Sequence, residues 1–386
     1  SSDLGFKNDT SPEITGGHQP GRMTAMAPAA QTPWWAWTWP VLAWVILAVS
    51  SFTGTNGVMA AAAAAILIAT VFAAVYHAEV VAHRVGEPFG TLVLAVAVTV
   101  IEVALIVSVM VSAPAEKAGV ARDTIFAAVM IVCNGIVGLC LLWGGARHHE
   151  QGFQVYGASA ALAVLAALTT LTMILPNVAT TVPGPLFNTA QLVFAGAASL
   201  LLYGSFVFIQ TVRHRDYFLP VANSGDEEAH AAPPSNKTAL LSAGLLLAAL
   251  VAVVGLAKAL TPTLEMGVDR FALPQSTVGI VIATLVLLPE ALAALRAARA
   301  NRLQTSLNLA LGSALASIGL TIPVVAAVSI AVRQPLELGL GAKEQVLLAL
   351  TLLVGVITLG TGRTTVLQGA VHLVVFAAFL LFSIVP

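Results

Sequence analysis

The sequence has little charge for its length. Asp, Glu, Lys and Arg make up 9% of its 386 residues, whereas 58% of the residues are hydrophobic. An ordinary soluble domain is roughly one quarter charged, and a water-exposed surface cannot be built from so few charges. We therefore predict an integral membrane protein whose main surroundings are the lipid bilayer.

The sequence also lacks a surplus of positive charge, because 17 Lys and Arg stand against 18 Asp and Glu. No nucleic-acid binding is expected without a basic surface. The two cysteines, Cys133 and Cys140, lie in one apolar run, which suits a buried helix face better than a disulfide or a metal site. The catalytic patterns HExxH and GxSxG are absent, so we predict neither an enzyme nor a cofactor.

Long apolar segments are what the sequence does contain. A helix needs about 20 mostly apolar residues to cross a bilayer. Eleven segments approach or meet this requirement: 34–52, 58–77, 89–112, 124–143, 155–175, 188–211, 238–259, 274–295, 305–331, 345–360 and 364–385. Four tryptophans flank the first segment, which indicates a membrane anchor. Residues 1–33 before it are predicted to be a disordered polar tail.

Basic residues in the connections predict the orientation of the chain. With eleven spans, eleven Lys and Arg lie on the side of the amino terminus and six on the opposite side. Cytoplasmic connections carry the excess of basic residues. We therefore expect a cytoplasmic amino terminus and a carboxyl terminus outside the cytoplasmic membrane.

An acidic, proline-containing segment divides the apolar chain. Residues 212–237, which include Asp226, Glu227 and Glu228, are predicted to form a cytoplasmic linker between 58–211 and 238–386. Each of these parts holds five spans, and an odd number inverts the second part relative to the first, as in many secondary transporters. The predicted fold is an all-α polytopic membrane protein with one extra amino-terminal helix, 34–52, and two inverted five-helix repeats.

Each half contains one acidic residue in the middle of a predicted span, Glu102 in the first and Glu290 in the second. A charged side chain at the centre of a spanning helix costs about 2.5 to 3.5 kcal/mol, so such residues usually mark ion or proton pathways. The alternative is a protonated Glu hydrogen-bonded to a neighbouring helix. We predict that this pair binds cations and protons.

Other residues near the pair offer further oxygen ligands. Pro289 is expected to kink its helix and to leave the Leu285 carbonyl without an amide donor. Asn134, Asn308 and Ser313 are candidate auxiliary ligands, although amides and small residues equally serve contacts between helices. An all-oxygen site of this kind suits Ca²⁺.

Two shallower acids precede the deep pair at similar distances, Glu79 by 23 residues and Glu265 by 25. Both lie near predicted helix ends. They are candidates for a proton pathway, and the alternative is a solvated helix end.

Two stretches resemble the calcium/proton exchangers of the Ca²⁺:cation antiporter superfamily, most of all the bacterial ChaA-like branch. They read AEVVAHRVGEPFGTLVLAVAVTVIEVALI and LVLLPEALAALRAARANRLQTSLNLALGSALASIGLTIP. The resemblance implies a bacterial antiporter with an extra first helix, five plus five inverted spans, and one essential Glu per half at Glu102 and Glu290. It implies transport of Ca²⁺, or of Na⁺ or K⁺, against H⁺ by alternating access.

The sequence departs from that family beside each Glu. Where many members have a Gly-Asn pair, this chain has Ala97-Val98-Thr99 and Val286-Leu287-Leu288, and the amide expected after Gly312-Ser313 is Ala316. Fewer side-chain oxygens leave Na⁺/H⁺ or K⁺/H⁺ exchange open beside Ca²⁺/H⁺ exchange, and a cation channel is a further alternative. The sequence predicts no oligomeric state.

Overall fold

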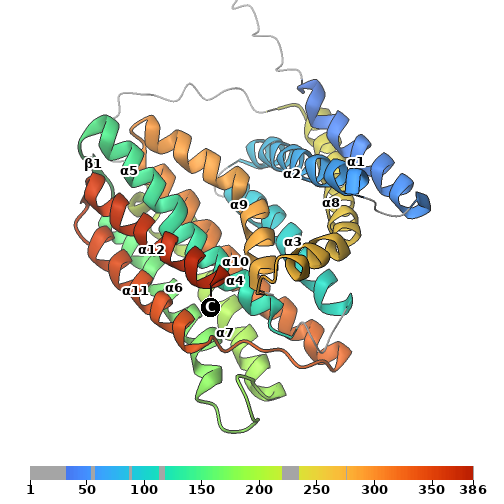
Figure 1. Ribbon diagram of the computed structural model, residues 1–386. Helices are drawn as coiled ribbons and strands as arrows, with labels where there is room; N and C mark the ends of the chain where they lie inside the picture. The colour runs from blue at the N-terminus through green and yellow to red at the C-terminus, as the bar shows by residue number, and fades with distance from the viewer. Residues whose placement is uncertain are drawn as a thin grey trace, which may run out of the picture. The chain divides into compact units, whose positions relative to one another are not determined.

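The computed structural model describes residues 32–53, 57–86, 89–112, 118–219, 234–274 and 276–385. These residues are almost entirely helical (Figure 1). The α-helices are α1 (Trp34–Thr53), α2 (Gly57–Val85), α3 (Phe89–Ser112), α4 (Val120–Met130), α5 (Val137–His148), α6 (Val155–Thr169), α7 (Thr189–Phe208), α8 (Asn236–Arg270), α9 (Ser276–Arg299), α10 (Leu303–Val332), α11 (Ala342–Leu359) and α12 (Val366–Ile384).

Shorter elements complete or join these helices. A π-helical turn, Ile131–Ile136, joins α4 to α5, while Thr170–Ile174 and Ile209–Arg213 extend α6 and α7. Two-residue strands β1 (Gln151–Gly152) and β2 (Arg363–Thr364) pair antiparallel, with Gln151 opposite Thr364.

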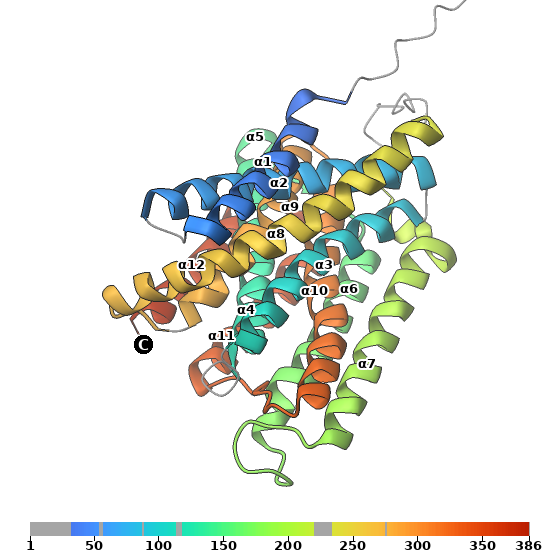
Figure 2. The same ribbon diagram turned by 90° about the vertical axis from the view of Figure 1, so that its right-hand side faces the viewer.

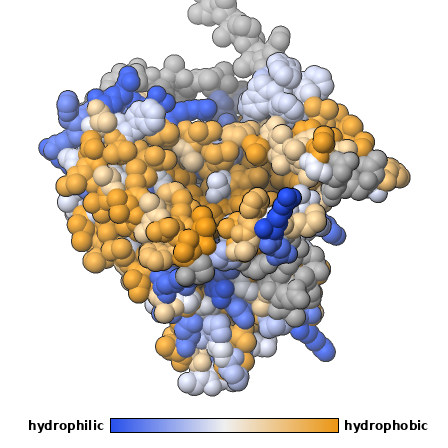
Figure 3. Space-filling model, in the orientation of Figure 1, coloured by the Kyte–Doolittle hydropathy of each residue, from blue (hydrophilic) through white to orange (hydrophobic). Residues whose placement is uncertain are grey.

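The predicted spans are confirmed as helices, each within a few residues of the expected start. Ten helices in the described residues are long and apolar enough to cross a membrane, and α3 contributes a shorter apolar stretch, Val96–Val111. Apolar side chains cover much of the face shown in Figure 3, with polar residues gathered toward the top and bottom of the view. The chain is an integral membrane protein.

Two helices run well past the segments predicted from hydropathy. Helix α2 continues to Val85 and α8 to Arg270. The 35 residues of α8 span about 52 Å at 1.5 Å per residue, more than the roughly 30 Å of a bilayer core. A helix can extend beyond the membrane span that it contains, because its backbone hydrogen bonds also form in water. Polar residues then mark the end of the span and not the end of the helix. Glu79 and Glu265 lie in these final turns, as expected.

Helices α1, α2 and α8 form one packed group beside α3 (Figure 2). Trp44 Nε1 in α1 donates a 3.1 Å hydrogen bond to the carbonyl of Ala248 in α8. Pro40 inside α1 has no amide hydrogen, so the Ala36 carbonyl lacks its helical donor. His77 Nε2 in α2 donates to that carbonyl at 2.9 Å. These bonds join the three helices into one unit.

The buried side chains of this group form an apolar cluster of their own, which we call the small cluster. It comprises residues of α1, α2 and α8, one face of α3, and Val286 of α9. A larger cluster contains the buried side chains of α4 to α7 and α9 to α12, with the far end of α3. The described helices therefore pack around two cores that meet at α3 and α9.

Glycines allow close contact within the large cluster. Gly369 of α12 faces Gly138 and Leu142 of α5. A Cβ atom on Gly369 would lie 2.7 Å from Leu142 Cα and 2.9 Å from the Gly138 carbonyl oxygen. A side chain there would collide with backbone. Small residues at this crossing thus let α5 and α12 pack backbone to backbone.

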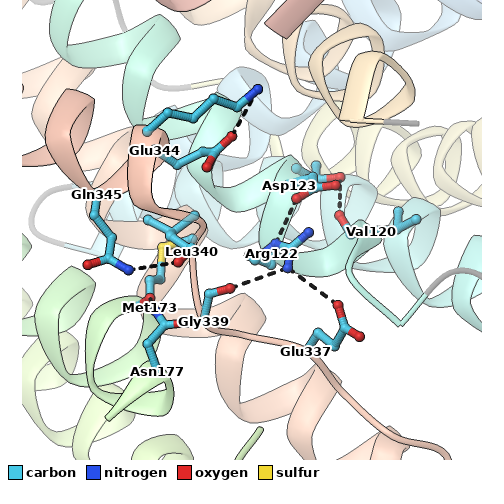
Figure 4. Close-up of polar contacts among 12 residues, drawn as sticks. Val120, Arg122, Asp123, Met173, Asn177, Glu337, Gly339, Leu340, Glu344 and Gln345 are labelled. Carbon is cyan, nitrogen blue, oxygen red and sulfur yellow. Dashed lines mark hydrogen bonds and ion pairs between the residues drawn. The ribbon is translucent and has the colours of Figure 1, made fainter. Parts of the chain in front are cut away.

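An ion-pair network fixes the start of α4 (Figure 4). Arg122 contacts Asp123 Oδ1 at 2.8 Å and Glu337 Oε2 at 3.4 Å, and donates to the Gly339 carbonyl at 3.3 Å. Helix α9 packs tightly on this braced segment, since a Cβ on Gly279 would lie 2.9 Å from the Thr124 nitrogen. The helix that carries Glu290 is therefore held against a fixed neighbour.

Candidate cation-binding site

Glu102 lies in the middle of α3, where the apolar run around it favours a continuous buried helix. The residue is 3% exposed. Ser317 of α10 donates a hydrogen bond from its hydroxyl to Glu102 Oε1. One carboxylate oxygen is thus held by the neighbouring helix.

Glu290 lies in α9 directly after Pro289, which is buried in a helix that is continuous from Ser276 to Arg299. The helix therefore continues through Pro289, which leaves the Leu285 carbonyl without a helical donor. Glu290 Oε2 is buried and has no hydrogen-bond partner within the described part of the chain. The site thus offers unsatisfied oxygen acceptors, which is what a hard cation or a proton requires.

The structure brings the two deep acids together. Helix α3, which carries Glu102, packs directly against α9, which carries Glu290, and against α10, which carries Ser317. In the described residues no group of three His, Cys, Asp or Glu side chains is placed to hold a metal ion. The site is therefore a carboxylate pair with neutral oxygen atoms around it.

The pair lies where the two apolar clusters meet. On α3, Ile101 belongs to the small cluster and Ile106 to the large one. On α9, Val286 belongs to the small cluster and Leu287 to the large one. A relative movement of the two groups of helices would therefore pass directly by the carboxylates.

Asn308 points its amide toward α6 and the turn before the linker. Its nitrogen donates to the Phe218 carbonyl at 2.6 Å, and its oxygen accepts from Gln304 at 2.9 Å. Gln304 in turn accepts from the Gln154 backbone at 2.6 Å. These contacts favour a packing role for Asn308 over cation binding.

Asn134 lies in the π-helical turn and belongs to another buried network. It donates to Thr351 Oγ1 at 2.9 Å and accepts from His372 Nδ1 at 3.2 Å. His372 also contacts Thr358 Oγ1 at 3.2 Å. Both ring nitrogens of His372 are paired, so this network also favours packing, here between the π-helical turn, α11 and α12.

The sequence alone predicts Ser313 as an auxiliary ligand and does not single out Ser317, the residue that bonds to Glu102. The signal was present, because Ser317 follows Ser313 by one helical turn and shares its face of α10. Ser313 is half-buried on that same face. The two hydroxyls give α10 a polar stripe toward the carboxylates.

Of the two shallower acids, Glu79 can be placed relative to the site. It lies on α2, which packs against α9, the helix that carries both Glu290 and Arg296. The side chain of Glu265 and the acidic residues 226–228 lie outside the described part of the structure. Glu79 thus lies on a helix that contacts the helix of Glu290.

Proteins with similar sequences are described as ion exchangers or ion transporters. The sequence profile described as sodium/calcium exchanger protein matches residues 55–212 and 241–385. The protein y4hA of Sinorhizobium fredii is 51% identical over 365 residues, which cover 93% of this chain and 98% of y4hA. The sodium-potassium/proton antiporter ChaA of Escherichia coli is 36% identical over 347 residues, 89% of this chain and 94% of ChaA.

Solved structures share the fold. The structure of native YfkE aligns with 91% of this chain and with 100% of the YfkE chain, with a TM-score of 0.68 at 17% sequence identity. The structure of an H⁺/Ca²⁺ exchanger, CAX, aligns with 90% of this chain and with 87% of the CAX chain, with a TM-score of 0.67 at 14% sequence identity. At these identities the likeness concerns the arrangement of the helices.

The hydrogen bond to Glu102 gives a first prediction. Ser317→Ala should weaken apparent cation binding by about tenfold or more, because a hydrogen bond to a charged group contributes about 1.5 to 3 kcal/mol. Concentration dependence of cation-driven proton movement in proteoliposomes measures this. Ser199→Ala is the control, since that buried hydroxyl bonds only to the Ala195 carbonyl of its own helix among the contacts described. Equal behaviour of the two variants would contradict the role of Ser317.

Proposed function

The chain belongs to the sodium/calcium exchanger protein family, and from that premise we propose that it exchanges an inorganic cation for protons at Glu102 and Glu290. The observation that carries this proposal is the buried carboxylate pair, one acid from each half of the chain, with Glu290 Oε2 lacking a partner in the described residues. We propose Ca²⁺ as the favoured cation.

The family matches support two related halves. The matched ranges 55–212 and 241–385 nearly coincide with the proposed repeats 58–211 and 238–386. Helices α3 and α9, which carry the deep acids, are each the second helix of their half. We propose that the repeats are inverted, with the amino terminus and the linker in the cytoplasm of a bacterium and the carboxyl terminus outside.

Charge neutralisation is the proposed basis of coupling. Two ionised carboxylates are costly to enclose in a medium of low polarity, whereas bound protons or a bound cation neutralise them. The carrier therefore changes its open side only when it is loaded with one or the other. Competition for the same oxygens makes the movement of one species depend on the other.

We propose that α1, α2 and α8 move as a unit across α3 and α9 to alternate access. The hydrogen bonds from Trp44 and His77 tie these helices together, and their apolar cluster is separate from the large one. Apolar contacts are not directional, so they resist sliding at the boundary between the clusters less than directional bonds would.

The oxygen ligands support Ca²⁺ as substrate, with Na⁺ or K⁺ as the second candidate. Two carboxylates, the Leu285 carbonyl and the hydroxyls of α10 form a set of hard ligands. Asn134 and Asn308 are bonded to other groups and do not add their amides to this set. The smaller number of ligands is the argument for Na⁺ or K⁺ as the second candidate. The relative ChaA is named a sodium-potassium/proton antiporter.

Proton flux in membrane vesicles tests the proposal directly. Ca²⁺, Na⁺ and K⁺ are each added to vesicles that hold a pH gradient, and an antiporter dissipates the gradient with the cations that it carries. Cation flux that is independent of any proton movement would instead indicate a channel.

Both deep acids should be required for exchange. Glu102→Gln and Glu290→Gln should insert normally and reduce exchange to the background of empty vesicles, because one neutral amide removes the charge that cation and proton share. Glu150→Gln is the control, since that carboxylate is exposed and pairs with Arg363. Substantial exchange in either deep variant would rule out a shared site.

Glu79 and Glu265 are proposed to conduct protons and not to bind the cation. Replacing either by Gln should slow transport or alter its pH dependence more than it changes cation affinity, because both lie near helix ends. Rates measured across a pH series at several cation concentrations separate the two effects. A loss of cation binding as large as that of Glu102→Gln would place the residue in the binding site.

The number of deep charges predicts the response to voltage. Two carboxylates release at most two protons for one Ca²⁺, so the exchange moves no net charge. A third proton would expose one elementary charge to about 2.3 kcal/mol per 100 mV. Ca²⁺-driven proton movement should therefore be nearly unaffected by a valinomycin-imposed potassium potential, with controls for K⁺ transport by the protein. A steep voltage dependence would require a further proton carrier.

A further inference from the structure

Two exposed arginines, Arg147 and Arg299, lie at the ends of neighbouring helices. Arg147 is in the last turn of α5, Arg299 is the last residue of α9, and the two helices pack together. In Figure 3 hydrophilic side chains gather at the upper left, where these helix ends lie in Figure 1. Within the described residues neither arginine has a carboxylate partner, and Glu150, which follows α5, pairs with Arg363. Both charges are therefore available to an anion from outside the chain.

The Arg299 side chain is held by an aromatic ring and not by an acid. Its Cζ lies 4.3 Å from the centroid of the Trp143 ring. A guanidinium that stacks on a ring keeps its N–H donors at its edge, where they match the oxygen atoms of a phosphate. Trp143 is 44% exposed and ends the predicted span 124–143. An indole in that position lies at the level of the lipid headgroups.

An arginine at a helix end can instead serve its own helix by bonding to the last carbonyl oxygens. In α9 these bonds come from other residues. His148 Nε2 donates to the Arg299 carbonyl at 3.0 Å, and Gln151 Nε2 donates to the Ala298 carbonyl at 2.9 Å. The end of α9 is thus capped without the Arg299 guanidinium, so a capping role does not account for this side chain.

Exposed apolar side chains precede the arginine on each helix. Leu139, Trp143 and Arg147 follow one another at intervals of four residues, so they lie on one face of α5. Leu139 is 42% exposed. On α9, Leu292 is exposed and precedes Arg299 by seven residues, which is two helical turns on one face. Each helix thus presents an apolar side chain within the span and a cation at its end, which is the polarity of a phospholipid.

We propose that the ends of α5 and α9 bind an anionic phospholipid, with Arg147 and Arg299 at its phosphate and with Leu139 and Trp143 beside an acyl chain. Basic residues between helix ends attract anionic headgroups. A zwitterionic headgroup brings its own cation to the phosphate and gains less from the arginines. Free phosphate shares the headgroup chemistry, but it makes no use of the apolar face below. This inference does not depend on the proposed exchange function.

Native mass spectrometry of the purified protein tests the proposal, because it counts the lipids that remain bound. The protein in a neutral detergent is titrated with phosphatidylglycerol and, separately, with phosphatidylcholine. Arg147→Gln and Arg299→Gln should each weaken binding of the first phosphatidylglycerol about fivefold, since a basic residue near a lipid surface contributes about 1 kcal/mol. The double variant should lose about 25-fold, and binding of phosphatidylcholine should stay unchanged. Equal affinity of the wild-type protein for the two lipids would overturn the proposal.

Arg213→Gln is the matched control. Arg213 is an exposed arginine at the end of another helical segment, Ile209–Arg213, so its loss changes the net charge by the same amount. Phosphatidylglycerol binding should remain at the wild-type value. A loss as large as that of Arg299→Gln would show a general attraction to basic residues and no site. Trp143→Leu keeps an apolar side chain but removes the ring beside Arg299, and it should weaken binding about threefold.

Competition with glycerol 3-phosphate distinguishes a lipid from a free phosphate ester. This probe carries the phosphate without acyl chains, so it should displace phosphatidylglycerol only at a concentration roughly a hundredfold higher, because burial of acyl chain adds affinity. Displacement at equal concentration would assign the site to a soluble anion and overturn the lipid. Arg147→Gln keeps the test decisive if Arg299→Gln fails to fold, because the Arg147 side chain makes no ion pair within the described chain.

Discussion

The cost of holding two carboxylates inside the bilayer is the constraint on which the structure of this protein depends. Glu102 and Glu290 lie on helices that are otherwise apolar, and they come from opposite halves of the chain. An enclosed pair of negative charges needs compensation from protons, a cation or hydrogen-bond donors. Ser317 supplies one donor to Glu102, while Glu290 Oε2 is without one in the described residues. This incomplete compensation supports the transport role that we propose for the pair, and it contrasts with His372, both of whose ring nitrogens have partners in the network with Asn134.

The same constraint explains why the pair lies at the boundary between two apolar clusters. When the two carboxylates are neutralised, closing the site to water on both sides costs little electrostatic energy. When they are ionised, removing them from water is costly. Helices α3 and α9 contribute side chains to both clusters, so the carboxylates lie where the two groups of helices would move past each other. In the proposed mechanism, this position couples neutralisation to movement without a separate mechanical linkage.

Hydropathy and the cost of buried charge predicted the eleven helices and the two central acids, because both depend on local composition. Ser317 was not predicted, since a serine in a spanning helix is common and its partner Glu102 is 215 residues away. The same reason applies to the amides. Asn134 and His372 are 238 residues apart, and nothing near Asn308 in the sequence indicates that it bonds to the Phe218 carbonyl.

The prolines show most directly how one local signal leads to different outcomes. Each proline within a helix frees the carbonyl four residues before it, which the sequence alone predicts. In α1 the freed carbonyl of Ala36 is bonded by His77 and connects two helices. In α9, Pro289 frees the carbonyl of Leu285, five residues before Glu290, and in α8, Pro262 frees the carbonyl of Lys258. Whether a freed carbonyl joins two helices or stays open to another ligand depends on the neighbouring helix, because only the tertiary fold decides whether a donor lies opposite it.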